Sequence, residues 1–290
     1  MIRLRVYSPA ARTGAVIAAL QEEPALATLA VHRGDSLRPP GDVVVADIPR
    51  ECANAVIERL RTTGVTEDGA IQLEPIPTWI SRPGYAAERL APGAESDAVV
   101  WSDVVQRAYE ESTLTFAFAT FMVFATLIAS IGIVLDSQIL IIGAMVLGPE
   151  FGAVAALGIS LVRRRAGLLR QGLTTLAAGF GLAISAACLA VLAGRGLGWV
   201  HAADIEGRRP GTDFIYQPDR WSILVAIIAG AAGVLAMTSA RSGGLTGVFI
   251  SVTTIPAAAN IAAGAAFGLW SEVGGSAAQL RTRTDVSARR

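Results

Sequence analysis

The sequence predicts an α+β protein: an N-terminal ferredoxin-like βαββαβ domain, then an all-α transmembrane helix bundle of about five apolar segments, two of them broken by proline. Three observations lead to this fold class. Charged residues make up 17% of the 290-residue chain, against about 25% in soluble domains, and the mean hydropathy is +0.51. Long uncharged stretches occur only after residue 111. Before that point, short apolar segments alternate between the period of a strand and the period of a helix.

In residues 1–77, the spacing of apolar residues predicts six elements in the order strand, helix, strand, strand, helix, strand. Ser8 and Pro9 mark the first helix start, because a capping residue followed by proline suits that position. The apolar positions of the six elements are Ile2, Leu4 and Val6; Val16, Ile17 and Leu20; Leu29 and Val31; Val43–Ile48; Cys52, Ala53, Val56, Ile57 and Leu60; and Ile71 and Leu73. The order predicts two right-handed βαβ units that share one antiparallel sheet. We expect this domain to bind a small ligand or to serve in assembly.

Two polar segments follow the domain. Residues 78–98 contain Pro83, Pro92 and Gly93 and are expected to be a linker. Residues 99–111 predict an amphipathic helix with Trp and Tyr on its apolar stripe. Such a stripe suits the membrane interface, and it equally suits packing on the N-terminal domain. The sequence leaves both alternatives open.

The remaining chain predicts a transmembrane bundle over 112–271 and a polar tail over 272–290. A helix needs about 20 apolar residues to cross a bilayer core of ~30 Å. Five stretches meet this length, and only the second contains a charged residue, Glu150. The five stretches are 112–135, 137–162, 171–194, 221–240 and 242–271. The lipid bilayer is therefore an expected partner.

The arginines predict the orientation. Arg163, Arg164 and Arg165 lie in a short loop between the second and third stretches, and basic residues in short loops stay cytoplasmic. No signal-like segment precedes the first apolar stretch. We therefore expect a multi-pass protein of the bacterial inner membrane with its N-terminal domain in the cytoplasm. The arginines of the tail leave its side open, and the fifth stretch either spans the membrane or re-enters.

Two prolines predict broken helices. Pro149 follows Gly148 near the middle of the second stretch, and Pro256 lies near the middle of the fifth. Proline removes a helix hydrogen bond and clashes with the preceding turn. Broken helices in corresponding positions of two inverted halves often mark a transport site. The repeat is incomplete here, because no sixth apolar stretch exists, and kinked prolines also occur in membrane helices without any transport role.

Glu150 is the candidate ion or substrate residue, because an acid inside a membrane is costly and is a functional candidate by default. Asn260, Thr253 and Thr254 lie near Pro256 and are the candidate partners if the two broken stretches face each other. This arrangement predicts a proton or cation site. The alternatives are a protonated glutamate tied to a backbone carbonyl, which serves only the structure, and a glutamate placed near the membrane interface by a re-entrant turn.

The segment Ile142-Gly143-Ala144-Met145-Val146-Leu147-Gly148-Pro149 and the stretch 248–264 resemble the domain of unknown function family 389 of bacterial membrane proteins. The resemblance covers roughly residues 80–275. It implies a polytopic inner-membrane protein, and it implies no activity. Family members usually continue into a further apolar helix, whereas residues 271–290 are polar and rich in arginine here.

Several function classes are excluded by composition. All 24 basic residues are arginine, which excludes Schiff-base chemistry and a P-loop lysine. Cys52, Cys188, His32 and His201 are isolated from one another, so the sequence offers neither a disulfide framework nor a metal site. We expect no catalytic residues, metal, cofactor or nucleic-acid partner, and no enzyme.

Two functions remain. The first is a transporter or channel-like protein gated by a cytoplasmic ligand-sensing domain. The second is a non-transporting membrane sensor or scaffold, whose cytoplasmic domain binds a small ligand or a protein partner. We also expect a homo-oligomer with its N-terminal domains in contact, because an open sheet has edges to cover.

Overall fold

The computed structural model describes residues 1–93, 98–201, 254–270 and 273–276, together with the single residues 205, 224, 228, 231 and 238. The chain forms two compact units. The N-terminal unit comprises Met1–Val104, and the helical unit begins at Val105.

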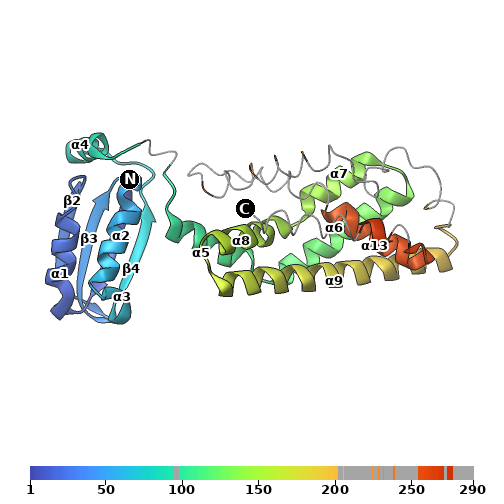
Figure 1. Ribbon diagram of the computed structural model, residues 1–290, viewed down its shortest axis with the longest axis horizontal. Coiled ribbons are helices and arrows are strands. Elements are labelled where there is room, and N and C mark those ends of the chain that lie inside the picture. Colours follow the sequence, from blue (N-terminus) through green and yellow to red (C-terminus); the bar gives the residue numbers. More distant parts are fainter. Residues whose placement is uncertain are drawn as a thin grey trace. The chain divides into compact units, whose positions relative to one another are not determined.

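The N-terminal unit contains a four-stranded antiparallel sheet in the order β2-β3-β1-β4 (Figure 1). The prediction of a mixed α+β chain with an N-terminal antiparallel sheet is therefore confirmed. The central strand β1 pairs with β3 on one side, where Leu4 faces Ala46, and with β4 on the other, where Leu4 faces Leu73. The strands are β1 (Ile2–Ser8), β2 (Thr28–Leu37), β3 (Pro40–Ile48) and β4 (Ala70–Pro75).

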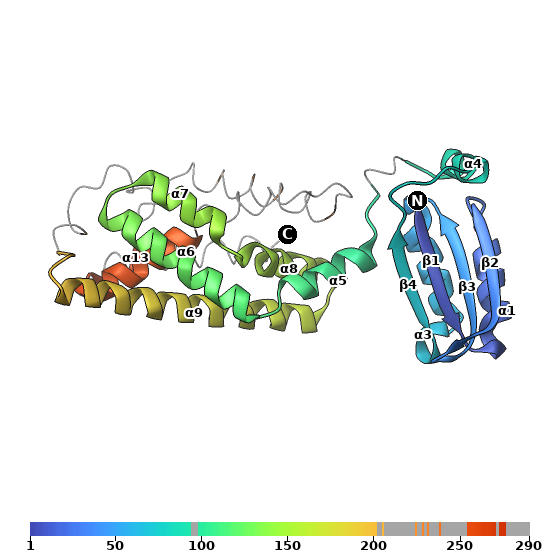
Figure 2. The same cartoon turned by 180° about the vertical axis from the view of Figure 1, so that it is seen from behind.

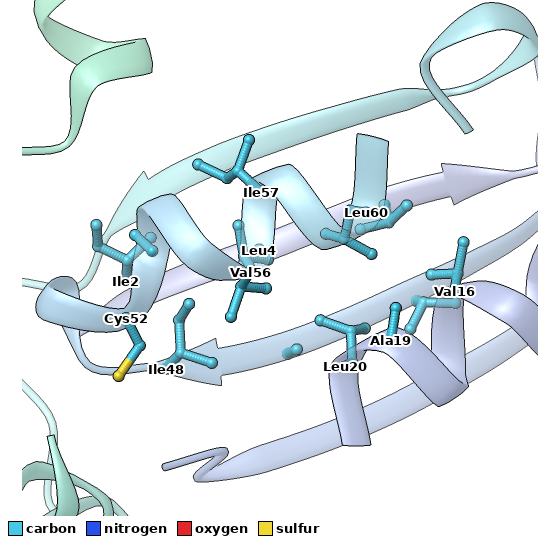
Figure 3. Packing of buried hydrophobic residues seen from close by; sticks show 14 of the residues in the cluster. Ile2, Leu4, Val16, Ala19, Leu20, Ile48, Cys52, Val56, Ile57 and Leu60 are labelled. Atoms are coloured by element: carbon cyan, nitrogen blue, oxygen red, sulfur yellow. The ribbon is translucent and has the colours of Figure 1, made fainter. Parts of the chain in front are cut away.

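Helices cover the apolar face of this sheet. Alternate residues of β1, namely Ile2, Leu4 and Val6, are buried. They pack against Leu20 of α1 and Leu60 of α2 within one hydrophobic cluster (Figure 3). The unit's helices are α1 (Ala10–Gln21), the 3-10 turn η1 (Arg50–Cys52), α2 (Ala53–Thr62), α3 (Val65–Asp68) and α4 (Arg82–Leu90). Helix α4 lies within residues 78–98, where the sequence predicts a linker.

The helical unit contains two helices, α6 and α9, that are long and apolar enough to cross a membrane. Helices α7 and α8 meet at a bend of 59°, and the count of such segments in the described residues rises to three if this pair is one broken span. The helices are α5 (Trp101–Glu111), which contains the boundary between the units, α6 (Phe116–Val134), α7 (Gln138–Leu147), α8 (Glu150–Val162), α9 (Ala166–Gly196) and α13 (Thr254–Phe267). The predicted stretch 221–240 lies outside the described residues except for four single positions.

The interior of the described helical unit combines many small side chains with larger ones such as Met122, Ile133 and Ile141, and many large apolar side chains lie on its surface. Ala125, Ala129 and Ala183 are fully buried, whereas Phe124 and Leu189 are 52% and 68% exposed. Soluble proteins seldom expose large continuous apolar patches, and small residues allow close helix packing in membranes. The distribution is compatible with a membrane protein.

Candidate functional site

The helix break predicted in the second apolar stretch is the junction between α7 and α8. Helix α7 ends at Leu147, Gly148 is extended, and α8 begins at Glu150 after Pro149. Proline has no N–H to donate to the preceding turn, so the two helices are separate and bent by 59°. Glu150 is consequently the first residue of a new helix inside an apolar segment.

Helix α8 lies antiparallel along the first half of α9. The two are joined by a short loop after Val162, and Ala153, Leu157 and Leu176 share one cluster. Gly172 of α9 allows a close approach here, because a Cβ on it would lie only 3.2 Å from the carbonyl oxygen of Ala153. The N-terminus of α8 therefore points toward the middle of α9.

Helix α13 lies along the second half of α9. Ile255, near its start, shares a cluster with Ala183 of α9. Near its end, the carbonyl of Ala266 accepts a hydrogen bond of 3.2 Å from Nη1 of Arg195, in the last turn of α9. Helix α13 thus runs parallel to α9, and α8 and the described part of α13 lie end to end along it, with the N-terminus of α8 next to the first described residues of α13 (Figures 1 and 2).

Glu150, the first residue of α8, and Thr254, the first described residue of α13, meet at this point. Oγ1 of Thr254 donates a hydrogen bond of 2.6 Å to Oε1 of Glu150. Glu150 is fully buried, and Thr254 is 8% exposed. The N-terminal end of a helix carries a partial positive charge that stabilises negative groups within the first turn. The N-terminal end of α8 and the Thr254 hydroxyl group therefore both favour negative charge at this position.

The other residues predicted around the site lie elsewhere or outside the description. Pro256 is the third described residue of α13 and is buried. Asn260 is fully buried, and its Nδ2 donates a hydrogen bond of 2.9 Å to Oγ of Ser276. Thr253 lies outside the described residues.

A second set of polar contacts holds the end of α5 on α8 and α9, and the sequence analysis does not single it out. A Cβ on Gly152 would lie 2.4 Å from Cβ of Glu111, so only glycine leaves room for this contact. Nε2 of Gln171 donates a hydrogen bond of 2.8 Å to the carbonyl of Tyr109, and Thr175 donates one of 2.7 Å to the carbonyl of Ser112. In the sequence, these contacts are indicated only by the polar residues Gln171 and Thr175 near the start of the third apolar stretch.

The environment of this contact changes the titration of Glu111. Burial raises the pKa of its carboxyl group, while the charge of Arg107 opposes the rise and that of Glu110 adds to it. Among the described residues, no three His, Cys, Asp or Glu side chains are grouped so that they could hold a metal ion.

Comparison with known proteins shows that the residues of this site lie in a segment that matches a known protein family. Residues 145–284, which include Glu150, Thr254 and Asn260, match the family described as domain of unknown function (DUF389). An uncharacterized protein of Methanocaldococcus jannaschii is 27% identical over 162 residues, covering 56% of this chain and 48% of that protein. The chain thus spans about half the length of this relative. No solved structure matches the chain significantly. The resemblance to the DUF389 family that residues 142–149 predict is therefore confirmed.

Proposed function

We propose that the chain is a polytopic inner-membrane transporter or channel-like protein with a proton or cation site at Glu150. The buried contact between Glu150, at the start of α8, and Thr254 of α13 carries this proposal. An acid in the centre of a membrane helix costs roughly 2.5–3.5 kcal/mol on insertion scales. Intramembrane acids of this kind are frequent in proton and ion pathways, and facing half-helices frequently bind ions in transporters.

The proposed mechanism is reversible protonation of the Glu150 carboxylate. In the ionised form, the hydroxyl of Thr254 and the N-terminus of α8 stabilise the negative charge. A proton that binds a carboxylate oxygen neutralises the charge and weakens both interactions. Protonation therefore changes how firmly α8 and α13 hold together, which would couple proton binding to a movement of these helices.

The proposal includes a membrane topology. The chain has about five apolar segments, of which the last either spans the bilayer or re-enters. Residues Thr254–Phe267 of this last segment form α13. Arg163–Arg165 support a cytoplasmic N-terminal unit.

Cysteine labelling tests this orientation. In a variant without Cys52 and Cys188, a membrane-impermeant maleimide added to intact cells is expected to label Asp136→Cys and not Ala166→Cys. Labelling of the Ala166 site from outside would contradict the orientation, and permeabilised cells control for accessibility.

For the N-terminal unit we infer a ferredoxin-like fold, a ligand-sensing or gating role and a role in homo-oligomer contact. The strand order β2-β3-β1-β4 supports the fold. The two edge strands, β2 and β4, offer unpaired backbone groups to a second copy. Light scattering in several mild detergents tests the assembly, and a monomer in all of them would contradict it.

A non-transporting sensor or scaffold is the second candidate, and one observation favours it. Three buried hydroxyl groups of the helical unit bond carbonyls of their own helices: Thr126 with Met122, Ser130 with Thr126, and Ser160 with Leu157. These hydroxyl groups are engaged within α6 and α8, and the bonds that they make do not form a polar path across the unit. In this alternative the bundle anchors the N-terminal unit.

Flux measurements distinguish the two candidates. Purified protein is reconstituted in vesicles with an internal pH dye, and proton, Na⁺ and K⁺ gradients are imposed in turn. We expect a pH-dependent flux in the wild type, its loss in Glu150→Gln, and wild-type behaviour in Glu110→Gln, which changes an exposed glutamate. Equal flux and equal pH dependence in Glu150→Gln would overturn the site. Absence of flux in the wild type under every gradient would favour the sensor.

A further inference from the structure

Helices α9 and α13 end in the same way. Gly198 and Gly268 follow their last residues with φ angles of 72° and 73°, a left-handed conformation that glycine adopts without a steric cost. The N–H of Trp199 then bonds the carbonyl five residues earlier at 2.9 Å, and the N–H of Leu269 does the same at 2.8 Å. Such closures satisfy carbonyl groups at the end of a helix.

Arg195 connects the C-terminal end of α9 to the C-terminal end of α13, so the two helices end at the same height along their common direction. Its Nη1 donates a hydrogen bond to the carbonyl of Ala266, and its guanidinium group lies 5.0 Å from the centre of the Phe267 ring. A cation is favoured here because both helices present their partially negative C-terminal ends. The Nε and Nη2 edge of the guanidinium has no hydrogen bond to another described residue.

Large amphipathic side chains surround this level and are exposed. Trp199 is 77% exposed and Trp270 is 72% exposed. A row of exposed leucines on α9, including Leu189 and Leu192, leads up to them. Tryptophan is enriched where hydrocarbon meets headgroups, because its ring is apolar and its N–H needs a partner. The exposed surface is thus apolar along the helices and amphipathic at their ends.

We propose that Arg195, Trp199 and Trp270 form a phospholipid contact site at one boundary of the bilayer. The guanidinium edge that Ala266 leaves open would bind the lipid phosphate, because two parallel N–H groups match two phosphate oxygens. The two indole rings lie at the level of the glycerol backbone, and the leucines of α9 contact the acyl chains. The occupant is a phospholipid of the surrounding bilayer.

This boundary sets the depth of Glu150. Thr254 lies twelve residues before Ala266 on α13, which is about 18 Å along the helix. A hydrocarbon core is ~30 Å thick. The bond between Thr254 and Glu150 is thereby placed close to the middle of the bilayer.

Depth-dependent fluorescence quenching tests the boundary. The full chain with Trp79, Trp101 and Trp221 changed to Phe is reconstituted in phosphatidylcholine and phosphatidylglycerol vesicles. The vesicles contain lipids brominated either near the headgroup or near the chain end. Further variants, Trp199→Phe and Trp270→Phe, leave one emitter each. We expect both emitters to be quenched more strongly by the shallow bromines. Stronger quenching by the deep bromines, or no quenching by either lipid, would overturn the proposal.

Retained lipid tests the phosphate contact. Phosphatidylglycerol that stays bound to the detergent-purified chain is counted by native mass spectrometry. Arg195→Gln is expected to lower it several-fold, whereas Arg170→Gln, an exposed arginine near the other end of α9, leaves it unchanged. Unchanged retention in Arg195→Gln, or an equal loss in both variants, would overturn the contact. Neither experiment depends on flux, so both are independent of the transport proposal.

Discussion

The hydroxyl group of Thr254 donates a hydrogen bond of 2.6 Å to Oε1 of Glu150, although the two residues are 104 positions apart in the chain. Glu150 is the first residue of α8, Thr254 is the first described residue of α13, and both are buried. The bond connects α8 to α13 beside α9, and it therefore links the predicted acid to the last apolar stretch. A substitution of Thr254 removes this bond while Glu150 stays unchanged.

Changing Thr254 to Val keeps the shape of the side chain and removes the donor. A buried hydrogen bond to a charged group contributes about 1.5–3 kcal/mol, so Thr254→Val is expected to lower the midpoint of thermal unfolding in detergent. Thr254→Ser keeps the hydroxyl group and should remain closer to the wild type. Equal midpoints for Thr254→Val and the wild type would show that the bond adds no stability.

Two glycines of α8 form a matched pair. A Cβ at Gly152 would lie 2.4 Å from Cβ of Glu111, whereas a Cβ at Gly158 meets nothing within 4 Å. Overpacking costs about 1–3 kcal/mol, so Gly152→Ala should destabilise the protein. Gly158→Ala should be neutral or slightly stabilising, since alanine favours a helix. Thermal unfolding of both variants checks the prediction, and equal midpoints would contradict it.

The N-terminal unit should lose stability in acid through Asp47. Burial alone would raise the pKa of this carboxyl group, but hydrogen bonds from Arg3 and Thr28, with the charge of Arg3, lower it overall. A lowered folded pKa means that the stabilisation is present above the unfolded value of about 3.9 and is lost as the pH falls through the folded value. Pulse proteolysis with pepsin should show a steeper loss of protection for the wild type than for Asp47→Asn. Asp35→Asn, at a carboxylate that is 63% exposed, should keep the wild-type profile.

Cys52 should be unreactive while the N-terminal unit is folded. Burial, followed by the carboxylate of Glu23, raises the pKa of its thiol to about 11. The thiolate is the nucleophile, so roughly one molecule in a thousand is reactive at pH 8. In a Cys188→Ser background, N-ethylmaleimide is expected to label Cys52 slowly, faster in Glu23→Gln and fully after denaturation. Rapid labelling of the folded protein would contradict the assigned environment.

Local rules account for what could be predicted. Ile2, Leu4 and Val6 alternate on a strand because successive side chains point to opposite faces, so their period predicts β1 without knowledge of its neighbours. Pro149 separates α7 from α8 because it lacks an N–H, wherever the two helices pack. The uncharged stretches likewise predict α6 and α9 from composition alone.

Contacts between distant segments could not be predicted in this way. The sequence suggests that Thr254 and Asn260 stand near Pro256, but only the tertiary structure places Thr254 on Glu150 and gives Asn260 a hydrogen bond to Ser276. Pro256 predicts a break in the last apolar stretch, and this stays a prediction because the described residues of α13 begin at Thr254. Periodicity and proline act within one or two turns, so the sequence determined where helices and strands form. The pairing of buried polar groups depends on which helix ends meet in space, and that was decided by the packing of α8 and α13 along α9.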